Sequence, residues 1–463
     1  MFEKLANIFR VPDLRKRVLF TLALLAVYRL GGHIPTPGID AAALSRIFER
    51  MRSGPLGLVD LFSGGQLSKL TIFALGIMPY ITSSIIFQLL TVIYEPLAKL
   101  QKEGELGRKK ITTWTRYMTV VLGAIQAFGI AITLQRGVGG EQVVLNPGAM
   151  FVFTTVMTLT AGTAFIMWLG EQITERGIGN GMSLLIFTGI VVGLPRGIAD
   201  LYDKVHNNAW GPFTLPAMII LIAVMITVVA FIVFVERSER RIPVQYAKRM
   251  MGRKVVGGGS TFMPLRVNSG GVMPVIFASS ILTFPQFIGQ YFKDSRYFKP
   301  VVDQLQWGEP LYTLLYCLGI IFFAYFYVSI VFNPREVADN MRKYGGFVPG
   351  IRPGERTASF INEILTRITL VGAAYLIIIS IIPEWMIAGI RLNHLPGALG
   401  RMFESMPAWV TSGLGVTFYF GGTSLLIVVG VAMDTANQVE SQLIMRHYEG
   451  FTPKSGRIRG RKW

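Results

Sequence analysis

The chain has 463 residues, of which 51% are hydrophobic and 16% charged, and its mean hydropathy is +0.48. This composition excludes an ordinary soluble globule with one core and predicts a polytopic membrane protein. The single cysteine, Cys317, excludes an intramolecular disulfide, and the 4 histidines stand singly without ligand spacing, so we expect neither a metal site nor a cofactor.

The N-terminal segment, residues 1–17, reads MFEKLANIFRVPDLRKR and is basic and amphipathic. It lacks the short apolar stretch and cleavage site of a secretory signal, so we expect the first span itself to direct insertion. Apolar runs of about 20 residues then predict ten transmembrane helices. The predicted spans cover residues 18–37, 71–93, 114–135, 150–170, 182–200, 216–235, 271–292, 311–332, 368–390 and 413–436. The fifth is short or continues past the bilayer edge, because its apolar run ends before Arg196.

The distribution of Lys and Arg predicts the orientation of these spans. An even number of spans places both termini on one side of the membrane. On that side fall 31 of the 45 Lys and Arg residues, against 12 on the opposite side. Because positive residues are enriched on the cytoplasmic side, we expect cytoplasmic termini, including a basic tail over residues 437–463.

The stretch over residues 57–70, GLVDLFSGGQLSKL, precedes the second span but is too short and too polar to cross the membrane. As a helix it would extend about 21 Å, against about 30 Å of hydrocarbon. Such backbone is tolerated at membrane depth only inside protein or against water, so we expect Leu67 and Leu70 to pack against neighbouring helices. Gly64 and Gly65 each weaken a helix by about 1 kcal/mol relative to Ala. A helix lying on the outer membrane surface is the alternative.

An internal repeat links the second and seventh spans. Residues 76–86, GIMPYITSSII, align with residues 271–281, GVMPVIFASSI, 195 positions further on. An offset of five spans inverts the topology, so two halves, residues 18–200 and 201–436, are predicted to be related by a pseudo-two-fold axis in the membrane plane. Chance similarity between apolar spans is the alternative, but the equivalent places of the two spans favour a repeat.

Five motifs, several of them long and ungapped, are spread over the chain. They are the SGG break at residues 63–65, WLGEQITERGIGNG at 168–181, VFNPRE at 331–336, FVPGIRPGE at 347–355 and FGGTSLLIVV at 420–429. Together they closely resemble the bacterial SecY family, the channel subunits of the Sec protein translocon, over nearly the whole chain. The resemblance implies an all-α membrane protein of ten helices in two inverted halves. It further implies a plug helix over residues 57–70 that closes the channel from the extracytoplasmic side.

The resemblance also implies a function. A member of this family moves unfolded polypeptides across the bacterial inner membrane and releases membrane segments sideways into lipid through a lateral gate. It is a channel subunit and not an enzyme. Its expected partners are SecE and SecG in a heterotrimer, the motor ATPase SecA, the ribosome with its nascent chain, and signal sequences.

A pore ring and a plug are implied at particular positions. The ring falls on Ile77, Ile81, Met182, Ile186, Ile276 and Ile427, and the plug on Asp60, Phe62, Ser63, Gly64 and Gly65. An apolar ring offers no fixed hydrogen-bond partner to a polypeptide, whereas an ion would have to shed water to pass it. An isoleucine in a span is more often ordinary packing. The repeat, which aligns Ile81 with Ile276, and the family resemblance favour the ring.

The resemblance makes the second and seventh spans the two faces of the lateral gate. We expect Pro79 and Pro274 to lie well inside these helices and to bend them. The gate residues implied are Pro79, Ser83, Ser84, Gln88, Pro274, Ser279 and Ser280. The alternative role for the small hydroxylated residues is close packing of membrane helices.

Two basic connections, residues 236–270 and 333–367, are longer than usual links between packed helices and suggest protruding structures that meet a partner. Positive-inside bias alone is the alternative explanation for their charge. Phosphates of rRNA attract Lys and Arg, and the resemblance implies that Arg253 and Arg352 contact the ribosome or SecA.

No GK dipeptide occurs, so the chain has no Walker A loop and is not itself the ATP motor. The glycine-rich run RGIGNG at residues 176–181 follows no predicted strand, so we expect a tight connection there. The rival functional class is a secondary solute transporter with inverted repeats. Such transporters usually place ionisable residues near mid-membrane, whereas Arg29, Arg116, Glu384 and Asp434 lie toward the ends of their spans.

Overall fold

A computed structural model gives the structure of the protein. It describes residues 11–40, 43–46, 63–135, 143–207, 214–246, 249–251, 254–256, 260–291, 304–305, 309–388 and 422–449.

Each predicted span overlaps one helix of the structure. In chain order the helices are α2 (Pro12–Gly31), α5 (Met78–Ile93), α7 (Glu105–Gln135), α8 (Ala149–Arg176), α9 (Gly181–His206), α10 (Thr214–Arg237), α11 (Met273–Tyr291), α13 (Pro310–Val331), α15 (Glu355–Ala388) and α18 (Gly422–Glu449). Within the described residues, five helices are long and apolar enough to cross a membrane by themselves. A sixth span is added if α5 is joined across a bend of 104° to α6 (Glu95–Lys102).

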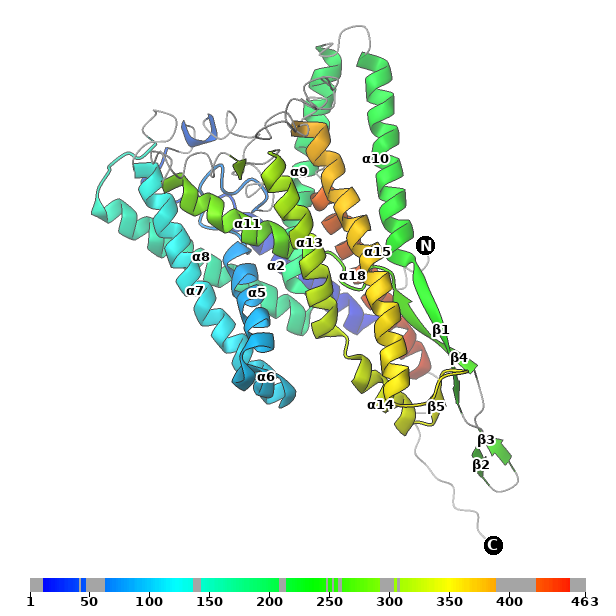
Figure 1. Ribbon diagram of the computed structural model, residues 1–463. Helices are drawn as coiled ribbons and strands as arrows, with labels where there is room; N and C mark the ends of the chain where they lie inside the picture. Colours follow the sequence, from blue (N-terminus) through cyan, green and yellow to red (C-terminus); the bar gives the residue numbers. More distant parts are fainter. Residues whose placement is uncertain are drawn as a thin grey trace, which may run out of the picture.

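Several helices are longer than the apolar runs that predicted them. Helix α7 begins at Glu105 rather than 114, and α15 begins at Glu355 rather than 368. In both cases several turns that carry polar and charged residues extend the helix at its N-terminal end, because backbone hydrogen bonding does not stop where hydrophobicity does. Figure 1 shows the long helices running side by side, with α14 (Pro334–Lys343) and the strands gathered at one end of the bundle.

The two halves form separate helix layers that meet along two seams. In the first half α5 packs on α7 and α7 on α8, and in the second half α11 packs on α13 and α13 on α15. These pairs are equivalent under the predicted repeat. One seam between the halves joins α5 to α11, and the other joins α9 to α10 and α18. Most of the largest buried apolar cluster lies along these seams, so the core of the molecule is shared between the halves.

The repeat is visible in the backbone where α5 and α11 begin. Gly76 and Gly271, aligned in the repeat, both have φ of +57°, a left-handed conformation that suits glycine. The carbonyl of Ile77 accepts from the amide of Ile81 at 3.1 Å, and the carbonyl of Val272 accepts from the amide of Ile276 at 3.3 Å. The same local structure thus starts one helix in each half, α5 in the first and α11 in the second.

The prediction that Pro79 and Pro274 bend these helices from inside is wrong. Helix α5 begins at Met78 and α11 at Met273, so each proline lies in the first turn. Residues 72–77 form turns and not the first part of the predicted span 71–93. A proline in a first turn removes an N–H that has no intrahelical partner there, so it favours the helix start without bending it.

The basic connections carry regular structure at the end of the bundle with α14. Strand β1 (Glu239–Tyr246) pairs antiparallel with β4 (Ser260–Arg266) on one side and with β5 (Gly346–Phe347) on the other. Strands β2 (Arg249–Met251) and β3 (Lys254–Val256) form a second, two-stranded ribbon. Ile242 and Leu265 bury against Val328 of α13 and Ile361 of α15, so the sheet is fixed to the second half.

Candidate functional site

A small apolar cavity lies where the two halves meet, close to the helix starts just described. Ile77 and Ile81 of the first half face it together with Ile186 of α9, and Ile276 of α11 faces it from the second half. The rest of its lining is Ser63, Leu75, Gly76, Met78 and Ser279. Its volume is about 10 Å³, room for about one water molecule. Four of the six predicted ring residues are therefore brought together around one space.

The other two predicted ring residues belong to the same apolar cluster but do not line the cavity. Ile427 of α18 is fully buried. Met182, at the start of α9, is half-buried, and its Sδ lies 2.4 Å from where a Cβ on Gly170 of α8 would stand. The Met182 side chain therefore occupies the space that this glycine leaves open.

The predicted plug segment is only partly a helix. Residues 57–62, with Asp60 and Phe62, lie outside the described residues, and 64–70 form turns rather than the helix expected through residue 70. The reason is local: Gly64 and Gly65 have φ of +73° and +78°, and Leu70 has φ of +40°. A right-handed helix does not continue through such residues. Ser63 lies at the cavity, so the segment reaches the constriction.

Three contacts hold this segment in place. A Cβ on Gly64 would lie 2.9 Å from Cα of Gly189, so the segment meets α9 backbone to backbone. The guanidinium of Arg29, near the end of α2, donates to the carbonyl of Gly64 at 3.3 Å. Leu67 and Leu70 are buried, as expected, in an apolar cluster that includes Ala127 and Ala131 of α7.

The predicted gate residues of α5 bond within the first half. Ser83 is fully buried, and its hydroxyl donates to the carbonyl of Thr115 in α7 at 2.8 Å. Pro79 faces α7 at Gly123, and Gln88 donates to Ser84 one turn earlier on α5 at 3.3 Å.

In α11 the hydroxyls of Ser279 and Ser280 donate to the carbonyl of Ile276 in their own helix, at 3.0 and 2.7 Å. The hydroxyls of Ser83 and Ser280 therefore do not link α5 to α11.

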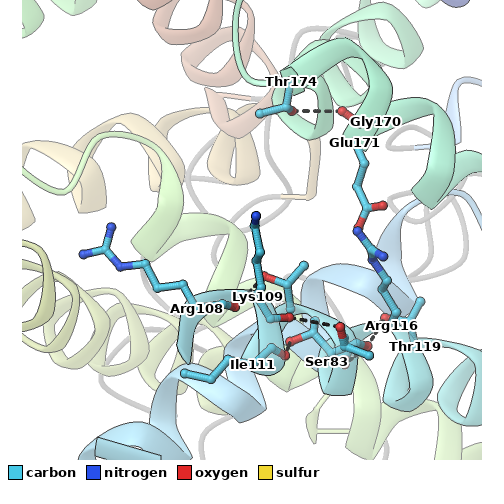
Figure 2. Close-up of polar contacts among 12 residues, drawn as sticks. Ser83, Arg108, Lys109, Ile111, Arg116, Thr119, Gly170, Glu171 and Thr174 are labelled. Atoms are coloured by element: carbon cyan, nitrogen blue, oxygen red, sulfur yellow. Dashed lines mark hydrogen bonds and ion pairs between the residues drawn. The ribbon is translucent and has the colours of Figure 1, made fainter. Parts of the chain in front are cut away.

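An ion pair that sequence reasoning missed stiffens the first half behind α5. Figure 2 shows Arg116 reaching from α7 to Glu171 of α8, with Nε 2.7 Å from Oε1. Glu171 is mostly buried, and Ser83 lies beside the same stretch of α7. The pair and the serine together bind α5, α7 and α8 into one unit.

The run RGIGNG forms the tight connection that was expected. Helix α8 ends at Arg176 and α9 begins at Gly181, where the Asn180 side chain caps the helix by accepting from the amide of Met182 at 3.1 Å. The amide of Ile178 donates to Thr21 Oγ1 of α2 at 3.1 Å. This part of the glycine-rich run is thus tied to a neighbouring helix.

Of the two predicted docking arginines, Arg352 is exposed and Arg253 lies outside the described residues. Gly350 and Gly354, on either side of Arg352, have φ of +82° and +106°. The carbonyl of Arg352 accepts from Thr357 Oγ1 at 3.0 Å. The arginine is therefore displayed on a short, well-defined turn before α15.

The chain has close relatives of known family. The SecY family model matches residues 71–436. The protein translocase subunit SecY of Escherichia coli K12 is 48% identical over 446 residues, which cover 96% of this chain and 95% of the relative.

Solved structures agree in fold. One, in which the plug domain of the SecY protein is described as stabilising the closed state of the translocation channel, gives a TM-score of 0.61 at 18% identity and covers 94% of each chain. Sec61 in the canine ribosome-channel complex from the endoplasmic reticulum gives a TM-score of 0.57 at 16% identity, again over 94% of each chain.

Proposed function

The chain belongs to the SecY family, and on that basis we propose that it is the channel-forming subunit of a protein translocon, which moves unfolded polypeptides across a membrane. The observation that carries this proposal is the small cavity at which isoleucines from both halves converge. An apolar constriction offers a passing chain no fixed hydrogen-bond partner, while an ion would lose its hydration there. Such a constriction discriminates by hydration and not by sequence, as a channel for many different polypeptides must.

We assign the pore ring to the six predicted residues and the plug to the segment 57–70, with Asp60, Phe62, Ser63, Gly64 and Gly65. Support for the plug comes from the place of Ser63 at the cavity and from the contact of Gly64 with Gly189. The part of the segment that reaches the cavity is held by one backbone approach and one long hydrogen bond from Arg29, which suits a closure that must move aside. Leu67 and Leu70 anchor its other end in the apolar cluster with α7.

The lateral gate for signal sequences and membrane segments is assigned to the seam between α5 and α11. The residues proposed for it are Pro79, Ser83, Ser84, Gln88, Pro274, Ser279 and Ser280. A gate must open without leaving buried polar groups unpaired. The bonds of Ser83 to α7 and of Ser280 within α11 support the proposal, because both remain intact when the two helices separate.

The end of the bundle with α14 and the strands is the proposed cytoplasmic side of a bacterial inner membrane, with both termini there. The proposed division into segment 1–17, halves 18–200 and 201–436, and tail 437–463 follows from the predicted spans and the internal repeat. Arg253 and Arg352 would meet ribosomal RNA or SecA, and SecE and SecG would complete the heterotrimer. The fold likeness to a channel taken from a ribosome-channel complex supports the ribosomal partner.

A secondary solute transporter is the rival function, since inverted repeats occur there too. The test uses liposomes that contain the complex of this chain with SecE and SecG, to which SecA, ATP and a secreted precursor protein are added. The proposal predicts precursor that becomes protected from external protease only when the complex and ATP are both present. Uptake of a small solute, with no protected precursor, would support the transporter.

A further inference from the structure

One short connector, residues 267–272, joins strand β4 to helix α11. The proposed docking residues Arg253 and Arg352 belong to the two basic connections that contain the strands, and α11 is a proposed gate helix. This connector is therefore the direct covalent link from strand β4 to the gate. Helices α15 and α18 enclose the connector tightly. A Cβ on Gly372 of α15 would lie 2.8 Å from the carbonyl oxygen of Val267, and a Cβ on Gly430 of α18 would lie 2.8 Å from Val272 Cγ2.

The side chain at the centre of the connector binds two elements at once. Asn268 is buried, and its Nδ2 donates to Glu236 Oε1 at 2.6 Å and to the carbonyl of Gly271 at 3.1 Å. Glu236 is in the last turn of α10, and Gly271 has the positive φ that sets the start of α11. One amide group therefore ties the end of α10 to the turn from which the gate helix begins.

The strand side of the connector is tied to the residue that follows α10. The amide of Val267 donates to the carbonyl of Ser238 at 3.0 Å, and Arg266 pairs with Glu239 in the β1–β4 register. The docking strands, the end of α10 and the start of α11 thus meet within a few residues. A hydrogen bond to a charged and half-buried carboxylate is among the stronger single contacts in a protein.

We infer that Asn268, held by Glu236, is a positioning residue for the gate: it keeps α11 against α5 until displacement of the β1–β4 strands pulls the amide away from the carboxylate. The inference rests on the proposed function, because it takes α5 and α11 as the gate. It adds a coupling between the surface that partners would touch and the helix that must move.

The test measures the separation of α5 and α11 in the complex with SecE and SecG, embedded in lipid nanodiscs. Spin labels are placed on cysteines introduced at Leu90 of α5 and Ile281 of α11, both exposed, in a Cys317→Ser background. Pulsed electron resonance then gives the distribution of distances between the labels. The unmodified gate is expected to give mainly the short distance.

Two single variants remove the contact. Asn268→Ala deletes the donor, and Asn268→Asp sets a second carboxylate against Glu236. Each is expected to raise the population with the long distance about tenfold, the factor expected for loss of a hydrogen bond to a charged group. The double variant Glu236→Gln with Asn268→Asp reverses donor and acceptor, so it restores the bond to residue 236 but not the bond to the Gly271 carbonyl. It should return part of the population to the short distance.

Ser269→Ala is the matched control. It removes a bond of the same connector, from Ser269 Oγ to the carbonyl of Arg266 at 2.7 Å, that does not reach α10. It should leave the distances unchanged. Unchanged distances in both Asn268 variants, even with lowered thermal stability, would overturn the inference and leave Asn268 a packing residue. If the unmodified complex also protects no precursor in the liposome assay, it is the proposed function that has failed.

Discussion

The four isoleucines at the cavity are proposed to seal the channel against ions. Between them Ile77, Ile81, Ile186 and Ile276 leave room for about one water molecule. We predict that Ile81→Asn or Ile276→Asn raises ion leakage, because a polar side chain can replace part of an ion's hydration shell. Ion conductance of the complex in planar bilayers measures this leakage. Ile125→Asn, on the exposed face of α7, is the control and should leave conductance at the wild-type level. Equal conductance in all variants would remove these isoleucines from the seal.

Gly64 lies where the proposed plug segment contacts the backbone of α9. Gly64→Ala combines a left-handed backbone with a Cβ only 2.9 Å from Gly189, so it should destabilise the seated segment by about 1–2 kcal/mol. The expected result is more frequent brief openings in single-channel records. Gly104→Ala is the control, because Gly104 has φ of +83° but open space around it. If both variants open equally often, the openings are not specific to Gly64 and the contact with α9 does not hold the segment.

At the scale of elements, the sequence predicted the helices well and their ends poorly. Apolar length placed all ten spans, but it cannot show that α5 begins only at Met78, because residues 72–77 are just as apolar as the helix that follows. The sequence signal for this helix start is Gly76 followed three residues later by Pro79. It can be recognised as a helix start only once the left-handed φ of Gly76 is known.

An ion pair between Arg116 and Glu171 joins α7 to α8. Arg116→Gln leaves the mostly buried carboxylate of Glu171 without its partner, which should lower the free energy of unfolding by about 2 kcal/mol. Thermal unfolding of the detergent-solubilised complex measures this as a reduced melting temperature. Arg367→Gln breaks an exposed pair with Glu363 on α15 and should change little. Similar losses in both variants would contradict a special role for the buried pair.

The turn before α15 gives a prediction about docking. Replacing Arg352 by Glu reverses the charge of an exposed side chain without touching the core, so translocation should fall severalfold while assembly with SecE is unchanged. Protected precursor in the liposome assay and co-purification of the subunits measure the two effects. Arg108→Glu, an equally exposed charge reversal in the first turn of α7, is the control. Normal translocation in the Arg352 variant would refute its docking role.

At the scale of the whole molecule, the internal repeat was the most informative feature of the sequence. It aligned Ile81 with Ile276 and Gly76 with Gly271, and the structure brings both isoleucines to one cavity and gives both glycines the same φ. The contacts that are proposed to hold the plug and the gate were not predictable in this way. They join residues that are far apart in the chain and share no sequence pattern: Arg29 with Gly64, Gly64 with Gly189, and Glu236 with Asn268.

A polypeptide channel closed by its own short segment should leak ions when that segment is removed. Ion conductance of the purified complex in planar bilayers is compared between the wild type and a variant lacking residues 60–70. We expect a tight wild type and a deletion variant that flickers open. If both stay closed while a small solute is taken up, the segment is not a plug and the chain is not acting as a polypeptide channel.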